Sequence, residues 1–215
     1  NAINLPFEEG ILLEHRTGEE AIVSAEARGL RHVFFAEREI ARIPGLDKSI
    51  EAIPIKTVGI LGSGTMGIGI SIAFADAGFE VTIVDPSAEA LERGLGLIEK
   101  TYEQSAAKGR LTEAQKNERF GNINGAAGYD SLSDVDLVIE AVFEDMDLKK
   151  KVFAELDGVC KAGAILASNT STLDIKEMAA VTKRPEAVIG LHFFSPANIM
   201  KLLEIVRTDK TSSEV

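Results

Sequence analysis

The glycine turn in residues 57–67, TVGILGSGTMG, limits what this chain can fold into more than any other feature. An apolar run stops at three glycines spaced as G-x-G-x-x-G, and apolar residues at helical spacing follow. This order predicts a strand that turns sharply into a helix. In such a turn Gly62 makes the bend, Gly64 lets a phosphate approach the backbone, and Gly67 lets the helix pack closely on the strand.

A second predicted strand follows the helix and ends in an acid. Residues 80–84 form this strand, and Asp85 comes 18 residues after Gly67. A carboxylate at this spacing accepts hydrogen bonds from the ribose hydroxyls of a dinucleotide. The helix that begins near Thr65 offers free N–H groups and the positive end of its dipole to phosphates. We therefore predict a dinucleotide site, and the alternative is a structural turn without a ligand.

Composition excludes several other classes of function. The chain has 215 residues, of which 27% are charged and 45% hydrophobic, which is typical of a globular domain with an appendage. The net charge of −11 argues against nucleic acid or an anionic membrane surface as the main partner. No apolar run approaches the ~18 residues of a membrane span, no secretory signal is present, and we predict no metal site. The single cysteine, Cys160, excludes an internal disulfide and is predicted to be a buried, inert thiol.

The first 54 residues differ from the rest. Residues 1–43 carry apolar side chains at helical spacing among charges, which predicts two amphipathic helices. His15 and His32 are expected to be surface or packing residues. Residues 44–54 contain Pro44, Gly45 and Pro54 and are predicted to be a linker. The chain starts without methionine and closes no element at its end, so we expect it to be a piece of a longer protein.

From Lys56 onward, apolar runs alternate with helical patterns. Strands are predicted at 57–61, 80–84, 122–125, 135–142, 164–167, 187–194 and 201–206, and helices at 65–77, 86–107, 111–120, 146–159 and 173–181. Strands that are apolar throughout predict a parallel sheet covered on both faces. The expected fold is therefore α/β: a Rossmann-type, doubly wound, mostly parallel sheet, preceded by a helical linker. The two helices between 86 and 120 are longer together than a crossover connection between two strands needs to be, so we expect a functional arm there.

Ligands of such sheets lie beyond the carboxyl ends of the strands, and polar residues gather there. They are Asp85, Glu144, Lys149, Ser168, Asn169, Thr170, Ser171, His192 and Glu204. Ordinary structural roles remain open for most of them. The serines, Asn169 and Thr170 can cap the next helix, and Glu144 with Lys149 can form a solvated face.

Glu204 is harder to explain by structure alone. It lies within the run LLEIV, where an unpaired carboxylate would be desolvated. His192 is the strand residue nearby in sequence that can pair with it, although a histidine of the core is the plainer interpretation. A carboxylate beside an imidazole favours the imidazolium, which suits a base that takes a proton from an alcohol as hydride leaves. A dinucleotide site with a buried His–Glu pair predicts the oxidation of an alcohol to a ketone.

Five motifs in order then resemble one known family. GSGTMG, VIEAVFEDMDLKKKVFAELD, SNTSTL, GLHFFSP and MKLLEIV, within about 55–207, resemble the L-3-hydroxyacyl-CoA dehydrogenases of fatty-acid β-oxidation. NLPFEEGILLEHRT and GLRHVFFAEREIARIPG resemble the end of the enoyl-CoA hydratase half and the linker of multifunctional β-oxidation enzymes. The resemblance implies two parts: 1–54 as the end of the hydratase-like half with its linker, and 55–215 as the NAD-binding domain. The hydratase's own catalytic acids would precede Asn1, so that activity is not expected in this chain.

The resemblance also implies roles for single residues. His192 matches the catalytic base, Glu204 its partner, and Ser171 the serine that binds the 3-oxygen of an acyl-CoA substrate. Lys108 lies where the family contacts the CoA moiety. The expected NAD-binding residues are Gly62, Gly64, Thr65, Met66, Gly67, Asp85, Glu144, Lys149, Asn169 and Ser195. Ser195 departs from the asparagine of many stand-alone members but fits the multifunctional branch. The family's catalytic asparagine and helical substrate domain would follow Val215, so this chain by itself is expected to be nearly inactive.

Two alternatives stay open at this point. One is a β-hydroxyacid dehydrogenase with a similar glycine turn, against which HFFSP and Glu204 argue, because that kind uses a lysine base. The other is an NAD-binding module without catalysis. The resemblance implies bacterial cytoplasm or the peroxisome as the compartment, without a choice between them.

Overall fold

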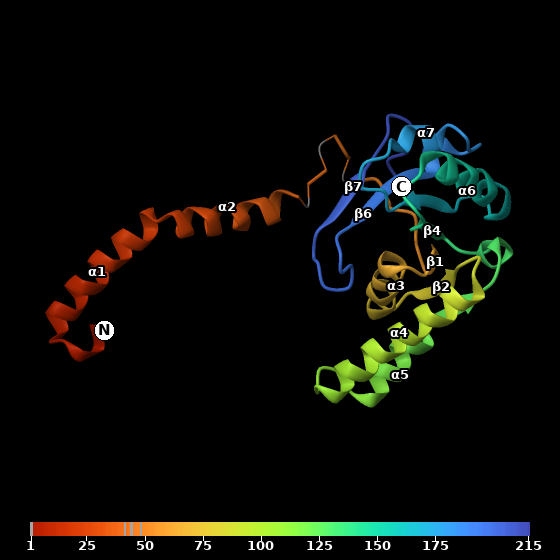
Figure 1. The fold of residues 1–215 in the computed structure, drawn as a ribbon. Coiled ribbons are helices and arrows are strands. Elements are labelled where there is room, and N and C mark those ends of the chain that lie inside the picture. Colours follow the sequence, from red (N-terminus) through yellow and green to blue (C-terminus); the bar gives the residue numbers. More distant parts are fainter. Residues whose placement is uncertain (1, 41, 44, 48) are drawn as a thin grey trace. The chain divides into compact units, whose positions relative to one another are not determined.

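The computed structural model describes residues 2–40, 42–43, 45–47 and 49–215 (Figure 1). These residues form two compact units, 1–50 and 51–215. The dividing point lies four residues before the boundary predicted from the sequence. Within the described ranges, no helix has the length and apolar character to cross a membrane.

The first unit is a pair of helices. A short turn of 3-10 helix, η1 (Ala2–Asn4), precedes α1 (Phe7–Val23) and α2 (Ala25–Glu39). Ser24 separates the two helices, because its Oγ accepts a hydrogen bond from the backbone N of Ala27 at 3.0 Å and so caps α2. His15 and His32 are both exposed. The predicted linker begins at Pro44, which with position 48 lies outside the described residues.

The second unit is built on a seven-stranded sheet. Its strands are β1 (Thr57–Leu61), β2 (Glu80–Val84), β3 (Ile123–Ala126), β4 (Leu137–Glu140), β5 (Ile165–Ser168), β6 (Val188–Phe193) and β7 (Leu203–Val206). The spatial order is β3-β2-β1-β4-β5-β6-β7, and every pairing is parallel except that of β6 with β7. The order reverses direction between β1 and β4, as in the Rossmann fold. The predicted fold class is confirmed.

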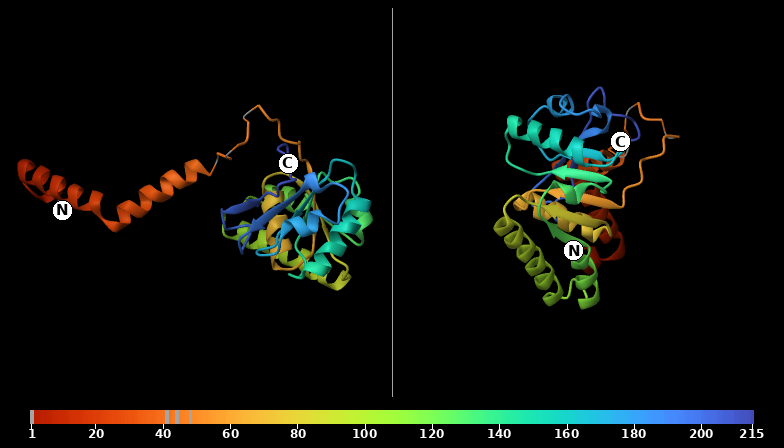
Figure 2. Two further views of the ribbon diagram at one scale, coloured as in Figure 1. Left: turned by 90° about the horizontal axis from the view of Figure 1, so that it is seen from above. Right: turned by 90° about the vertical axis from the view of Figure 1, so that its right-hand side faces the viewer.

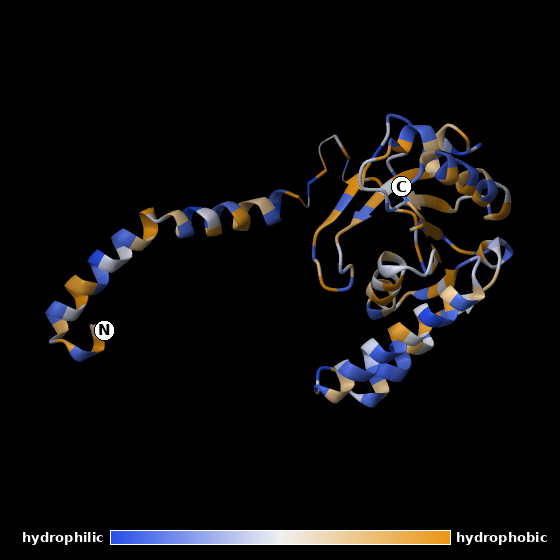
Figure 3. Ribbon diagram, in the orientation of Figure 1, coloured by the Kyte–Doolittle hydropathy of each residue, from blue (hydrophilic) through white to orange (hydrophobic). Residues whose placement is uncertain are grey.

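Helices cover both faces of this sheet (Figure 2). They are α3 (Thr65–Asp76), α4 (Ala88–Ala107), α5 (Glu113–Gly121), α6 (Met146–Val159) and α7 (Ile175–Ala179), with 3-10 turns η2 (Tyr129–Leu132) and η3 (Pro185–Ala187). Alternate residues of one strand point to opposite faces. In β4, Ile139 joins the cluster that contains α3 and α4, whereas Val138 joins the cluster that contains α6 and α7. Figure 3 shows the strands of the sheet as mainly hydrophobic.

Several boundaries differ from the predicted ones, and local hydrogen bonds explain the differences. α7 begins at Ile175 and not at 173, because the Asp174 carboxylate caps it by accepting from the Lys176 backbone N at 2.8 Å. Likewise α5 begins after Thr112, which forms a capping box with Gln115. The strand predicted at 135–142 is shorter, and η2 was not predicted.

α4 and α5 lie side by side and form the predicted arm (Figure 1). At its base, the Tyr102 hydroxyl donates to Asp76 Oδ1 at 3.0 Å, and Arg119 pairs with the same oxygen at 3.0 Å. Burial raises the pKa of Tyr102, and the charge of Asp76 adds to this effect. These contacts hold the arm against the end of α3.

Candidate functional site

The carboxyl ends of the parallel strands meet at one edge of the sheet, and the predicted site residues follow them. Most predicted residues stand near the end of a strand or in the loop after it. The exceptions are Thr65, Met66 and Gly67 in the first turn of α3, Lys149 in α6, Lys108 directly after α4, and Glu204 near the start of β7. The geometry of each part of this edge shows which residues the fold brings together.

The glycine turn has the shape that a phosphate-binding turn requires. Gly62 adopts a φ of 105°, and a Cβ there would lie 2.7 Å from the carbonyl oxygen of Ala141. A Cβ on Gly67 would lie 1.8 Å from the carbonyl oxygen of Gly62. A Cβ on Gly64 would meet no atom within 4 Å, so the second glycine faces open space. The turn therefore leaves its free side at the N-terminus of α3, where a dinucleotide phosphate fits.

Asp85 is bound to the glycine turn. Its Oδ2 accepts from the backbone N of Ser63 at 2.9 Å and from the Ser63 hydroxyl at 2.8 Å, and its Oδ1 accepts from the backbone N of Ser87 at 2.9 Å. Partial burial acts to raise the pKa of Asp85, but these hydrogen bonds and the nearby Arg93 outweigh burial and lower the pKa. A fixed, ionised carboxylate therefore stands next to the turn, as a ribose contact requires.

Glu144 joins the loop after β4 to the loop after β5. Its Oε1 accepts from the Thr170 hydroxyl at 2.6 Å, from the Ser171 backbone N at 3.0 Å and from the Ser171 hydroxyl at 3.3 Å. Burial acts to raise the pKa of Glu144, and the hydrogen bonds with the nearby charge of Lys149 outweigh it and lower the pKa. Ser171 thus contacts Glu144 and does not cap a helix.

Lys149 does not lie on a solvated face, which was the structural alternative for it. Its side chain is 1% exposed, and Nζ lies 2.6 Å from Glu140 Oε1 and 3.4 Å from Glu144 Oε2. Sequence reasoning gave Glu140 no role, although it interrupts an otherwise apolar strand. That interruption was the available signal, because a carboxylate in such a strand needs a partner. The contact of Lys149 with the cofactor stays a prediction.

Asn169 connects β5 to the strand that carries the predicted base. Its Oδ1 accepts from the backbone N of Phe193 at 2.9 Å, which is the residue after His192. Asn169 therefore fixes the separation of β5 and β6 at their carboxyl ends and caps no helix. Its predicted contact with the cofactor stays a prediction.

His192 and Glu204 form the predicted pair. They stand opposite each other in the antiparallel pairing of β6 and β7, and His192 Nδ1 lies 2.8 Å from Glu204 Oε2. The expectation of a buried pair was wrong for this chain, since the side chains are 20% and 53% exposed. The reason is the position of β7, an edge strand that is mostly exposed along its length.

The remaining predicted residues are less constrained by the structure. Thr65 is exposed at the first position of α3, and Met66 is partly buried and packs against the core. Ser195 is exposed after β6, and Lys108 is exposed at the end of α4. Cys160 is buried, and burial raises the pKa of its thiol.

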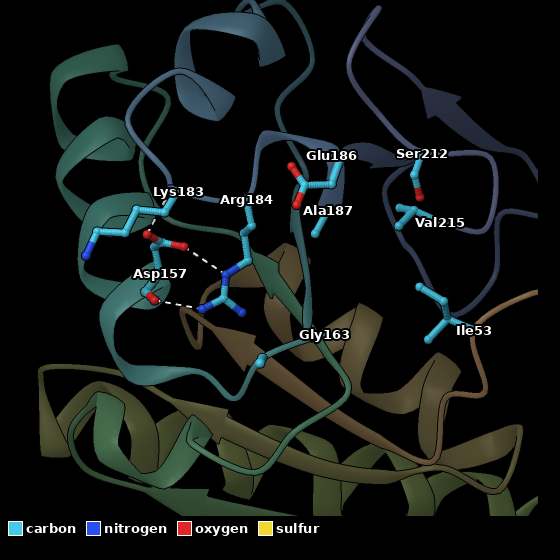
Figure 4. A pocket seen from close by; sticks show the side chains of 10 residues that line it. Ile53, Asp157, Gly163, Lys183, Arg184, Glu186, Ala187, Ser212 and Val215 are labelled. Atoms are coloured by element: carbon cyan, nitrogen blue, oxygen red, sulfur yellow. Dashed lines mark hydrogen bonds and ion pairs between the residues drawn. The ribbon is translucent and has the colours of Figure 1, made fainter.

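A cavity of about 400 Å³ lies away from this edge (Figure 4). Its lining includes Gly163 and Ala187, which precede β5 and β6, so it lies at the opposite edge of the sheet. The guanidinium group of Arg184, in the wall of the cavity, donates hydrogen bonds to the Asp157 carboxylate and to the carbonyl oxygens of residues 157, 160 and 161. None of the predicted site residues lines this cavity.

The family described as "3-hydroxyacyl-CoA dehydrogenase, NAD binding domain" matches residues 57–215. The chain belongs to this family. The cofactor expected from the glycine turn and Asp85 is therefore NAD. No group of three or more acidic, histidine or cysteine side chains in the described ranges is arranged to hold a metal ion.

Relatives of known function are multifunctional proteins. The chain is 42% identical to the peroxisomal bifunctional enzyme of Cavia porcellus, over 98% of this chain and 30% of that protein. It is 39% identical to the glyoxysomal fatty acid β-oxidation multifunctional protein of Brassica napus, over 96% of this chain and 29% of that protein. The chain thus spans less than a third of the length of either relative.

A solved structure agrees with the family. The (S)-3-hydroxybutyryl-CoA dehydrogenase of Ralstonia eutropha superposes with a TM-score of 0.72 at 43% identity, over 74% of this chain and 56% of that one. This likeness confirms the Rossmann-type fold of the second unit.

Proposed function

We propose that this NAD-binding domain takes part in the oxidation of L-3-hydroxyacyl-CoA to 3-oxoacyl-CoA in fatty-acid β-oxidation. The observation that carries the proposal is the His192–Glu204 pair at 2.8 Å, at the carboxyl edge of a sheet whose glycine turn fits NAD. Family membership identifies the cofactor, and the pair supplies the base that the oxidation of an alcohol needs.

The tautomer of His192 follows from its partner. The Glu204 carboxylate accepts a hydrogen bond from Nδ1–H of His192, so Nε2 carries no proton and is the acceptor for a substrate hydroxyl. When the hydroxyl O–H bond breaks, its proton moves to Nε2, and the Glu204 charge stabilises the resulting imidazolium. The carbon that bore the hydroxyl becomes a carbonyl and loses its hydrogen as hydride. NAD, when bound, accepts that hydride.

Ser171 is proposed to bind the 3-oxygen of the substrate. Its hydroxyl lies 3.3 Å from Glu144 Oε1, and its backbone N lies 3.0 Å from the same oxygen. The backbone bond is the shorter one, so it can hold the loop while the hydroxyl turns toward a substrate oxygen. Lys108 on the arm is proposed to contact the CoA moiety. Glu144, Lys149, Asn169 and Ser195 are proposed to meet the nicotinamide half of NAD.

The chain is proposed to be one part of a longer multifunctional enzyme. The relatives named above are about three times its length, which supports this proposal. Residues 1–54 would be the end of a hydratase-like half and a linker, and a helical substrate domain would follow residue 215. Those relatives are peroxisomal and glyoxysomal proteins, so a peroxisomal location is proposed, with bacterial cytoplasm as the alternative.

Substitution of the base tests this proposal. In the full-length protein, His192→Gln should lower the rate of 3-hydroxyacyl-CoA oxidation by ~10²-fold or more, because proton transfer by a positioned base contributes about that much. Glu204→Gln should cause a similar loss, because it removes the charge that stabilises the imidazolium. NADH affinity, measured by calorimetry, should stay close to that of the unchanged protein in both variants. Unchanged turnover in either variant would show that the His–Glu assignment is wrong.

A further inference from the structure

Glu140 lies at the centre of a buried polar network beneath the site. It ends β4, its side chain is 0% exposed, and its two oxygens accept three hydrogen bonds. Oε1 accepts from the backbone N of Val142 at 2.7 Å and from Lys149 Nζ at 2.6 Å, and Oε2 accepts from the Ser168 hydroxyl at 2.7 Å. Glu140 therefore joins β4 to β5 and to α6.

The alternation of the strands explains why these groups meet. Glu140 and Ser168 are partners in the parallel register of β4 and β5. Each lies two residues after a strand residue that packs toward α6 and α7, namely Val138 and Leu166. Lys149 stands near the beginning of α6, on the same face of the sheet.

The network continues from Glu140 to the residues that face a ligand. Lys149 Nζ lies 3.4 Å from Glu144 Oε2, and Glu144 Oε1 holds Thr170 and Ser171. A second branch runs from the Ser168 hydroxyl, which accepts from the backbone N of Thr170 at 3.2 Å. Both branches start at Glu140 and end in the same loop.

Fold stability alone is a poor explanation for this arrangement. Burying two charges costs desolvation free energy, and replacing such a pair by well-packed apolar side chains is often neutral or stabilising. What the pair provides here is geometry: the ammonium group has one short contact, to Glu140, and one longer contact, to Glu144.

We propose that Glu140 is a positioning residue of the cofactor site, which holds the loop of residues 170–171 by two routes: through Lys149 and Glu144, and through Ser168. Glu140 itself has no exposed surface. The inference rests on the proposed function, because it assigns Glu144 and Ser171 to the cofactor and substrate. Without the charge of Glu140, Lys149 would have Glu144 as its remaining carboxylate partner. The ammonium would then draw Glu144 away from Thr170 and Ser171.

The main test is Glu140→Gln in the full-length protein, with Asp157→Asn as the matched control. Asp157 pairs with Arg184 at 2.8 Å, both side chains are largely buried at 7% and 17% exposure, and Asp157 lies at the far end of the same helix, α6. Each variant removes one carboxylate charge from a buried ion pair that has one of its two partners on α6. Thermal unfolding, calorimetry with NADH, and the KM for NAD are measured on both.

We expect both variants to unfold at a lower temperature, but only Glu140→Gln to weaken NADH binding, by about tenfold or more, with a matching rise in the KM for NAD. Equal loss of NADH affinity in both variants would reduce Glu140 to a stability role and overturn the proposal. Wild-type affinity in Glu140→Gln would overturn it as well. If the unchanged protein binds no NADH, the proposed function itself fails, which is a separate result.

Ser168→Ala provides a second, milder variant in case Glu140→Gln does not fold. It removes the donor to Glu140 Oε2 and the acceptor of the Thr170 backbone N, while Lys149 and Glu144 keep their charges. We expect NADH to bind about threefold or more weakly, with a rise in the KM for NAD. An affinity and a KM equal to those of the unchanged protein would contradict the proposal.

Discussion

The carboxylates of the site differ in their surroundings, and these surroundings suit different tasks. Glu140 is fully buried and bound on both oxygens, so its role is to hold other groups. Asp85 is partly exposed and tied to the glycine turn, and Glu204 is 53% exposed beside the proposed base. Burial thus decreases from Glu140, which is proposed to position its neighbours, to Asp85 and Glu204, which are proposed to bind the ribose and to stabilise the base.

Asp85 should give a preference for NADH over NADPH. Its pKa is lowered, so it is ionised at neutral pH, and a 2′-phosphate beside it would meet like charge. The repulsion is roughly 4 kcal/mol per unit pair at ~4 Å and an effective dielectric of ~20, and solvent will reduce it. In calorimetry we expect NADPH to bind at least ~10-fold more weakly than NADH. Asp85→Asn should reduce this difference between the two affinities. Equal affinities in the unchanged protein would refute the role given to Asp85.

At the scale of elements, β1, the glycine turn and α3 form one unit whose glycines differ in purpose. Gly67 is needed for packing, because a Cβ there would overlap the carbonyl oxygen of Gly62. Gly64 has open space around it and a φ of −74°, so the backbone itself does not require a glycine. We therefore propose that the opening at Gly64 serves the approach of the cofactor phosphate.

These two glycines give opposite expectations for substitution by alanine. Gly67→Ala should lower the unfolding temperature strongly, because backbone must move to admit the methyl group. Gly64→Ala should leave the unfolding temperature nearly unchanged but weaken NADH binding by ~10-fold or more, because the methyl group occupies the approach of the phosphate. Thermal unfolding and NADH titration of both variants check this. A Gly64→Ala variant with full NADH affinity would mean that the phosphates lie elsewhere.

Asp136 joins the amino ends of the neighbouring central strands β1 and β4 and should make the stability of the fold depend on pH in the acid range. Its carboxylate accepts from Lys161 Nζ at 2.7 Å and from the backbone N atoms of Thr57 and Lys56 at 3.0 and 2.7 Å. The Lys161 bond first, and then the backbone bonds, hold the pKa of Asp136 well below its usual range. Because the folded-state pKa lies below the ordinary ~3.9, this stabilisation is present above about pH 4 and is lost as the pH falls further.

Asp136→Asn tests that contribution by thermal unfolding at two pH values. At pH 7 we expect a loss of about 2 kcal/mol, the scale of hydrogen bonds to a charged group, or roughly 4–8 °C for a domain of this size. At pH 3 the difference between the variant and the unchanged protein should shrink. A difference that is constant with pH would show that the charge of Asp136 contributes nothing.

The sequence predicted the elements of the sheet better than the contacts of single side chains. The glycine spacing, Asp85 and the alternation of apolar runs are local patterns, so they identified the fold. The Glu140–Lys149–Ser168 network could not be predicted in the same way, because it depends on the register of two strands and on α6. The exposure of Glu204 also escaped prediction, since a sequence does not show that β7 is an uncovered edge.

At the scale of the whole molecule, the chain contains a cofactor domain, and we propose that it contributes only part of a substrate site. The glycine turn, Asp85 and the Glu144 loop are all within the second unit. The His192–Glu204 pair, in contrast, lies between β6 and the edge strand β7, where Glu204 is 53% exposed next to exposed Leu202 and Ile205. We propose that a second wall, supplied from outside residues 1–215, covers this edge and holds the acyl thioester against the nicotinamide.

The most direct test compares residues 1–215 with the full-length protein in one pair of assays. Calorimetry with NADH should give affinities within about threefold of each other, because the cofactor contacts lie within this chain. Oxidation of NADH with acetoacetyl-CoA should be at least ~10²-fold slower for residues 1–215, because positioning of reactants accounts for up to ~7–11 kcal/mol of a barrier. Comparable turnover in both proteins would show that the substrate site lies wholly within this chain, and loss of NADH binding by residues 1–215 would show that the cofactor site does not.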